Sequence, residues 1–158
     1  MRQLLRTAFV VAVLFAAPSL VSEAAGSGAE LFEANCQICH QAQGVGVGGQ
    51  YPRLAGRASV IASSPEGRKF MSQLVLNGMS GKISVDSRFL VGFMPGFDRL
   101  SDADAAAILT YISGLESEQL KPAAFSAEEI SAARLGGRVN TSEMATIRNR
   151  LAGEGIIP

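Results

Sequence analysis

The sequence predicts an all-α fold that carries one small β-hairpin and a helical extension at its C-terminal end. Three observations predict it. Apolar residues recur at helical spacing in segments that begin at capping residues, alternation with a period of two is confined to residues 82–93, and two further capping patterns follow Pro122. At 158 residues, the chain is long enough for one domain with a modest core plus appendages.

The first 24 residues have the layout of a secretory signal peptide. Two arginines precede an apolar stretch from Ala8 to Ala17, Pro18 breaks that stretch, and Ser22-Glu23-Ala24 offers small residues around a cleavage site. An uncleaved membrane anchor is the alternative, but the segment is shorter than the roughly 20 apolar residues that a bilayer-spanning helix needs. We therefore expect residues 1–24 to be removed on export to a bacterial periplasm, leaving no membrane anchor.

The balance of charge argues against one class of partner. The chain has 14 basic and 14 acidic residues, and removal of residues 1–24 takes away two of the former and one of the latter. Proteins that bind nucleic acid present a basic patch or stripe, which this near-neutral sequence lacks. We expect no nucleic-acid partner.

Residues 25–118 are expected to form the main domain, beginning with a short helix over residues 28–35 that delivers Cys36 at its end. Residues 41–58 are rich in glycine and predict an irregular segment. A second helix should begin after Ser64, which is a favourable N-cap because its hydroxyl can accept from the first helical turn, and Pro65 suits the first helical position.

The second helix is expected to end at Gly78, a residue that tolerates the backbone conformation of a helix stop. The alternating residues 82–93, interrupted by Asp86-Ser87-Arg88, predict a two-stranded hairpin, with a loop as the alternative. A third helix should begin at Ser101, because Asp102 and Asp104 would place negative charge at its positive end.

Residues 119–158 are predicted to form a helical extension. Ser126-Ala-Glu-Glu and Asn140-Thr-Ser-Glu are capping patterns, and Met144, Ile147 and Leu151 follow at helical spacing. The extension is too short to bury a core of its own, so we expect it to dock on the main domain. The alternative is that its apolar stripe docks on a partner protein.

The pattern Cys36-Gln-Ile-Cys39-His40 predicts covalent attachment of one haem c. Two thiols three positions apart on one helical turn can add to the two vinyl groups of a porphyrin, and the imidazole of His40 then points at the iron. A thioredoxin-like redox pair would be expected after a strand, a zinc site would need four ligands, and a plain disulfide leaves the histidine unexplained.

The second axial ligand of such a haem must come from another residue type, because His40 is the only histidine. A methionine, a lysine or an open position are the choices. Met94 is favoured, since it lies in a segment where Gly92, Pro95 and Gly96 fix an extended loop. Met79 is the alternative as a methionine in a flexible loop, whereas Met71 and Met144 lie on apolar helix faces and are expected in the core.

The chain resembles class I c-type cytochromes over about residues 28–115. The resemblance is carried by the order and content of four segments: Leu31-Phe32-Glu-Ala-Asn-Cys-Gln-Ile-Cys-His, Tyr51-Pro-Arg-Leu-Ala-Gly56, Met94-Pro95-Gly-Phe97, and Leu100-Ser-Asp-Ala-Asp through Leu109-Thr-Tyr111-Ile112. It implies a cytochrome c-like arrangement of helices around one covalent haem, with the hairpin before the distal methionine.

The same resemblance implies roles for individual residues. His40 would be the proximal iron ligand and Met94 the distal one, the Pro52 carbonyl would accept the second imidazole N–H of His40, and Leu54 would pack on the haem. Phe32 and Tyr111 would meet where the first and last helices of the main domain cross. The stretch Leu76-Asn-Gly-Met-Ser-Gly-Lys-Ile-Ser-Val-Asp resembles a narrower subgroup that serves periplasmic quinoprotein dehydrogenases or copper nitrite reductases.

These features together predict a non-enzymatic, periplasmic one-electron carrier between a donor dehydrogenase and a terminal acceptor, docking transiently on both. One alternative is an electron-transfer subunit held in a periplasmic dehydrogenase complex. Another is a five-coordinate haem enzyme or gas-binding protein, although a peroxidase would want a distal acid–base residue that the sequence lacks.

Overall fold

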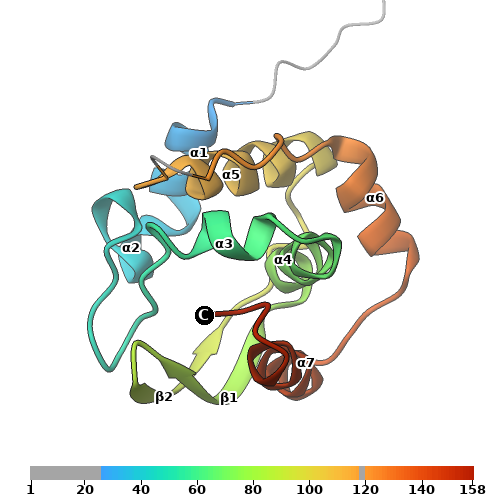
Figure 1. Cartoon of the computed structure of the whole chain (residues 1–158). Helices are drawn as coiled ribbons and strands as arrows, with labels where there is room; N and C mark the ends of the chain where they lie inside the picture. The colour runs from blue at the N-terminus through green and yellow to red at the C-terminus, as the bar shows by residue number, and fades with distance from the viewer. Residues whose placement is uncertain (1–25, 118–119) are drawn as a thin grey trace, which may run out of the picture.

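The computed structural model describes residues 26–117 and 120–158; the predicted signal peptide, residues 1–24, lies outside them. The described residues form mostly helices, with one two-stranded antiparallel hairpin at the lower edge of the molecule in Figure 1, which confirms the predicted fold class. The elements, in chain order, are α1 (Gly28–Asn35), α2 (Gln37–His40), the 3-10 helix η1 (Ala42–Gly44), α3 (Ala58–Ala62), α4 (Pro65–Asn77), β1 (Met79–Val85), β2 (Arg88–Met94), α5 (Asp102–Gly114), α6 (Ala127–Leu135) and α7 (Thr141–Gly153).

The helix ends lie where capping chemistry predicts them. The hydroxyls of Ser64 and Ser101 accept from the backbone N–H groups of Gly67 and Asp104, each at 3.0 Å, and so begin α4 and α5. Gly78 ends α4 with φ of 73°, a conformation that suits glycine. Two short helices, α2 and α3, lie in segments where no helical period is visible in the sequence.

Helices α1 and α5 cross in close contact at the upper side of the molecule (Figure 1). Gly28 permits this approach, because a Cβ at that position would lie only 2.3 Å from the Ala107 carbonyl oxygen. Nearby, the rings of Phe32 and Tyr111 pack in a tilted arrangement, with centroids 5.4 Å apart and planes inclined by 51°, so the contact implied by the family resemblance is present. The crossing holds the helix that leads into Cys36.

The hairpin is longer than the alternation predicted. Its register pairs Met79 with Met94 at one end and Val85 with Arg88 at the other. Asp86 and Ser87 both have positive φ, 49° and 61°, as a two-residue hairpin turn requires. The expectation that Met79 lies in a flexible loop is therefore wrong, because it is the first residue of β1, and Met94 ends β2 instead of lying in a loop.

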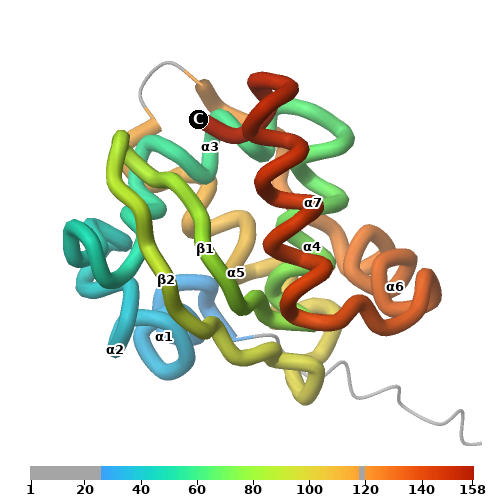
Figure 2. Tube along the Cα trace, turned by 90° about the horizontal axis from the view of Figure 1, so that it is seen from below, coloured from blue at the N-terminus to red at the C-terminus, as the bar shows by residue number. Residues whose placement is uncertain are grey.

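Helices α6 and α7 pack against the main body of the chain, as Figure 2 shows for α7 beside β1 and α4. Their side chains belong to the same core as those of α4 and α5: the buried members from the extension are Phe125, Ile130, Ala133, Met144, Leu151 and Ile157. The prediction that the extension docks on its own main domain is confirmed. Its apolar stripe is thus already covered, which argues against a docking role for that stripe.

Polar contacts fix the extension in place. Arg68 of α4 donates from Nε and Nη2 to the two carboxylate oxygens of Glu129, each at 2.7 Å, and from the guanidinium to the carbonyls of Ala123 and Ala124. Asn149 of α7 donates to the Lys82 carbonyl of β1 at 3.1 Å. The outer edge of β1 is therefore bonded to α7, which protects an edge strand from pairing with another chain.

Candidate functional site

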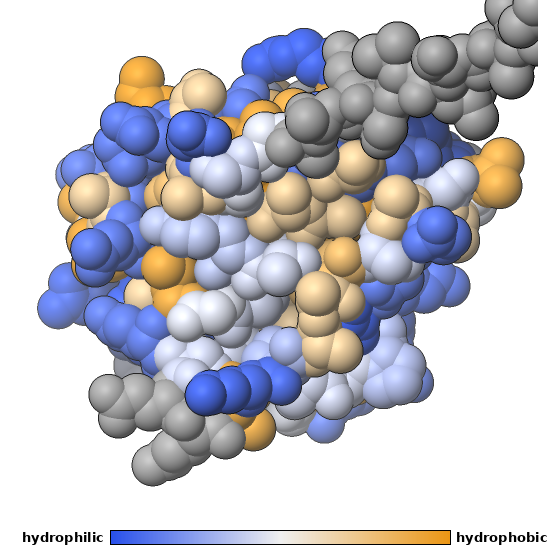
Figure 3. Space-filling model, turned by 90° about the horizontal axis from the view of Figure 1, so that it is seen from above, coloured by the Kyte–Doolittle hydropathy of each residue, from blue (hydrophilic) through white to orange (hydrophobic). Residues whose placement is uncertain are grey.

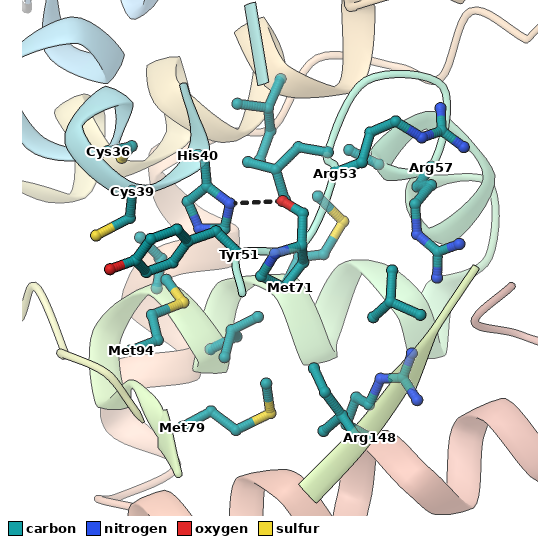
Figure 4. Close-up of a pocket in the computed structure, with 18 of the residues that line it drawn as sticks. Cys36, Cys39, His40, Tyr51, Arg53, Arg57, Met71, Met79, Met94 and Arg148 are labelled. Carbon is teal, nitrogen blue, oxygen red and sulfur yellow. Dashed lines mark hydrogen bonds between the residues drawn. The ribbon is translucent and has the colours of Figure 1, made fainter. Parts of the chain in front are cut away.

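An apolar cavity lies between α2, α3, α4 and the hairpin, with a volume of about 320 Å³ (Figure 4). Its wall is mostly aliphatic and aromatic: it includes Phe32, Leu54, Ile61, Phe70, Leu74, Val75, Ile83, Val85, Leu90, Phe97, Ile108, Leu109, Ile112 and Ile157. All seven predicted site residues also line it, namely Cys36, Cys39, His40, Pro52, Leu54, Met79 and Met94. The structure thus brings together residues that are up to 58 positions apart in the chain.

Cys36 and Cys39 lie on one turn that follows α1. The Cys36 N–H donates to the Phe32 carbonyl at 2.8 Å, and the His40 N–H donates to the Cys36 carbonyl at 2.9 Å, so the turn continues directly from the helix. Both thiols are free, and burial raises the pKa of the Cys36 thiol to about 11, with a smaller contribution from Cys39. A catalytic redox pair needs a readily formed thiolate, so this environment disfavours a thioredoxin-like activity.

The imidazole of His40 has a defined tautomer. Its Nδ1 lies 2.9 Å from the Pro52 carbonyl oxygen, which can only accept, so the proton is on Nδ1 (Figure 4). This is the hydrogen bond that the family resemblance implied. Burial lowers the pKa of His40 below its ordinary value, against the opposing effect of the Pro52 hydrogen bond. The ring is therefore held neutral with the lone pair of Nε2 available, as a metal ligand must be.

Three methionines line the cavity. Met79 and Met94 are directly opposite each other in the hairpin register, and Met71 extends from α4 with 4% of its surface exposed. In Figure 4, Met94 is drawn on the side of Cys39 and Met79 on the side of Arg148. Met144, by contrast, lies on the buried face of α7 and is fully buried in the core, as its helical spacing predicted.

Comparison with known proteins identifies the family. A family model described as cytochrome c matches residues 25–116. A cytochrome c-552 from Thermus thermophilus is 33% identical over 114 residues, covering 70% of this chain and 76% of that protein. A second cytochrome c-552 from the same species is 34% identical over 110 residues, covering 68% of this chain and 83% of that protein. The chain belongs to the cytochrome c family.

Membership in the cytochrome c family brings a covalently bound haem c and an electron-carrier role. The cavity suits this group on its own chemistry: it combines an apolar wall, two thiols on one turn, a neutral imidazole and thioether sulfurs. When bound, haem supplies the one-electron iron couple, and the chain supplies the ligands, the apolar surroundings and the exclusion of water.

Several residues of the cavity wall were not predicted from the sequence, chiefly Arg57, Arg148 and Ile157. The sequence does contain a signal for Arg148. It lies four residues after Met144 and three before Leu151, so it shares their buried helix face. A charged residue on an apolar stripe is a signal that it meets something polar. Ile157 gave no such signal, because its place depends on where α7 docks.

The described residues also bear on the membrane question. Within residues 26–117 and 120–158, no helix has both the length and the apolar character that crossing a bilayer requires. On the face viewed in Figure 3, the most hydrophobic residues are scattered singly among hydrophilic ones.

Proposed function

We propose that this cytochrome carries single electrons in the periplasm, between a donor dehydrogenase and a terminal acceptor, with its haem attached through Cys36 and Cys39 and its iron bound by His40 and Met94. A saturated iron in an apolar pocket has no open position for a substrate, so its function is outer-sphere electron transfer. The thioether ligand favours the ferrous state relative to a second imidazole.

The observation that carries this proposal is the composition of one cavity wall. The two thiols and His40 reach the cavity from the turn at α2, whereas Met79 and Met94 reach it from the hairpin. A neutral nitrogen ligand and a sulfur ligand are thus available from separate elements around the same space. This arrangement supports a six-coordinate iron over a five-coordinate one.

Packing favours Met94 over Met79 as the distal ligand. Met79 contacts a small cluster within the hairpin, formed by Ile83, Val85 and Leu90, as well as the main core, so its side chain joins the two clusters. Met94 packs against the main core alone. Its segment is held against α4 by the Phe97 N–H, which donates to the Val75 carbonyl at 2.8 Å. Met79 therefore has a packing role that Met94 lacks.

The ligand assignment can be tested by spectroscopy on matched variants. The oxidised protein should show the far-red sulfur-to-iron charge-transfer band, which Met94→Ala should abolish and Met79→Ala should retain. Met79→Ala should instead lower the free energy of unfolding. A fully buried methionine costs about 2–5 kcal/mol when truncated, and the cost for the partly buried Met79 should be smaller. Loss of the band in Met79→Ala alone would assign the iron ligand to Met79.

Carbon monoxide binding tests whether the sixth coordination position of the iron is occupied. The reduced wild-type protein should bind carbon monoxide slowly or not at all, because Met94 occupies the sixth position, and Met94→Ala should bind it rapidly. Rapid binding by the wild type would instead favour the alternative of a five-coordinate gas-binding protein or enzyme.

Exposure at the cysteine turn supports transient exchange with partners. Ile38, between the two cysteines, is 85% exposed, so the attached edge of the cofactor would lie close to the surface. A small apolar contact of this kind suits brief encounters better than a permanent complex. Ile38→Glu should slow electron exchange with a donor or acceptor without changing the midpoint potential. Stable co-purification with a dehydrogenase would favour the alternative of a permanent subunit.

The periplasmic location rests on the predicted leader and has its own test. The mature protein should begin at Ala25 and fractionate with periplasmic contents. A mass that retains residues 1–24 would contradict cleavage.

A further inference from the structure

Two buried arginines line the haem cavity at the end away from the cysteines. Arg57 is the residue that precedes α3 and is 7% exposed, and Arg148 lies on α7 and is 5% exposed. Figure 4 shows the two guanidinium groups on the opposite side of the cavity from Cys36 and Cys39. Arg148 comes from the extension, outside the segment that the cytochrome c family model matches.

Charge on the cavity wall is one-sided. The described residues that line it include Arg53, Arg57 and Arg148 but no aspartate, glutamate or lysine. Outside the wall, Asp86 at the hairpin turn accepts from Arg57 at 2.8 Å and also faces Arg53 at 3.5 Å, so one carboxylate is shared by two guanidinium groups. Arg57 also donates a hydrogen bond to the main-chain oxygen of Pro158.

Arg148 is the less compensated of the two. Its guanidinium donates to the Ser84 carbonyl and, at 3.5 Å, to the Asn149 side chain, and it makes no ion pair within residues 26–117 and 120–158. Burial lowers its pKa, and the positive charge of Arg57 lowers it further, so the two cations are near neighbours. Keeping a charge buried without a counter-charge costs several kcal/mol, so an anion is expected beside it.

The cofactor itself can supply this anion, because haem c has two propionate groups that each end in a carboxylate. These lie on the part of the porphyrin remote from the vinyl groups that form the thioethers. With the thiols at one end of the cavity and the arginines at the other, we propose that Arg57 and Arg148 bind the haem propionates. The extension thereby completes the haem site. This inference rests on the proposed attachment through Cys36 and Cys39.

The experiment compares midpoint potentials of the holoprotein in matched variants. Arg148→Gln and Arg148→Met remove the charge, and Arg150→Gln removes an exposed arginine two residues away on the same helix, where it pairs with Glu154. An uncompensated propionate favours ferric iron, so the ratio of reduced to oxidised protein at a fixed ambient potential should fall about tenfold in both Arg148 variants. For a one-electron couple this is a downward shift of about 59 mV.

Arg150→Gln should leave the midpoint potential unchanged. Arg148→Lys, which keeps the charge, should recover most of the shift. The apolar Arg148→Met variant covers the case in which the glutamine variant does not fold, since apolar side chains are well tolerated in place of buried ions.

The far-red band separates this inference from the proposed ligation. If the band is retained and the potential falls only in the Arg148 variants, the arginine acts on the propionates. If the band is retained and the potential equals that of Arg150→Gln, the inference is overturned while the His40 and Met94 assignment stands. If the wild type lacks the band, the ligation is wrong, and the shift between wild type and Arg148→Met still decides the role of the arginine.

Discussion

Single residues control how closely the elements approach one another, and Gly28 is the clearest case. Its missing side chain allows α1 to lie against the backbone of α5. Because α1 leads directly into Cys36, the position of the attachment turn depends on this approach. Gly28, which has no functional side chain, thus helps to position the haem-attachment turn that follows α1.

Replacement of Gly28 by alanine should lower the free energy of unfolding by about 1–3 kcal/mol, the usual cost of overpacking a close contact. The added Cβ would meet the Ala107 carbonyl oxygen at 2.3 Å, so the helices must separate. Gly114→Ala on α5 is a matched control, because a Cβ there meets nothing within 4 Å. Urea denaturation of both variants measures the difference, and equal midpoints would contradict the packing argument.

At the scale of elements, the helix boundaries could be predicted because caps are local. Ser64, Ser101, Ser126 and Asn140 each accept from a backbone N–H three residues on, as their sequence patterns suggested. The reciprocal half of the capping box is present at Ser126, whereas at Asn140 the side-chain amide donates to Glu143 instead.

What could not be predicted depends on contacts between distant segments. Strand β1 begins at Met79, three residues before the predicted alternation. Met79 to Gly81 pair with Gly92 to Met94, although glycines interrupt the alternating pattern there. Helix α3 has only five residues, too few to show a period. The predicted haem contacts Pro52 and Leu54 do face the cavity, yet Arg57 and Arg148 were missed because only the docking of α7 makes them neighbours.

The docking of α6 should depend on pH through Glu129. Hydrogen bonds from Arg68, with a smaller effect of its charge, hold the pKa of this carboxyl below its ordinary value of 4.5. The folded state thus binds a proton less readily than the unfolded state. The stabilisation is therefore fully present above about pH 4.5 and is lost as the pH falls through the lowered pKa.

Glu129→Gln keeps an acceptor for the capping box but removes the charge. Since the pair is partly exposed and screened, the variant should be less stable by about 1 kcal/mol at pH 7. Urea unfolding at a series of pH values should show this difference shrinking towards zero in acid. A difference that stays constant with pH would mean that the ion pair is not its source.

At the scale of the whole molecule, the main body and the extension share one core. Residues from α6 and α7 are buried in the same cluster as Phe32, Phe70 and Ile108. Regions that share a core in this way usually unfold together. The extension is therefore expected to melt with the haem domain and not before it.

Met144→Ala should lower the stability of the entire protein by about 2–5 kcal/mol, since Met144 is fully buried. Leu135→Ala, at an 86% exposed position of the same extension, should change it by less than about 0.5 kcal/mol. Thermal melting followed by haem absorbance and by far-UV circular dichroism should give coincident transitions. A haem transition unaffected by Met144→Ala would mean that the extension is energetically separate.

The contact between Arg57 and Pro158 spans 101 positions, and it has a consequence for the order of events during maturation. The cysteine turn lies near the start of the described chain, whereas the side of the cavity formed by Arg148 and Ile157 comes from its end. Contacts between residues so far apart are expected to form late, because closing a long loop costs entropy before any contact is gained. We therefore expect the cavity to stay open on this side until α7 docks, so that a bulky cofactor can enter before closure. Docking of α7 would then place Arg148 and Ile157 against the bound cofactor and complete the cavity wall.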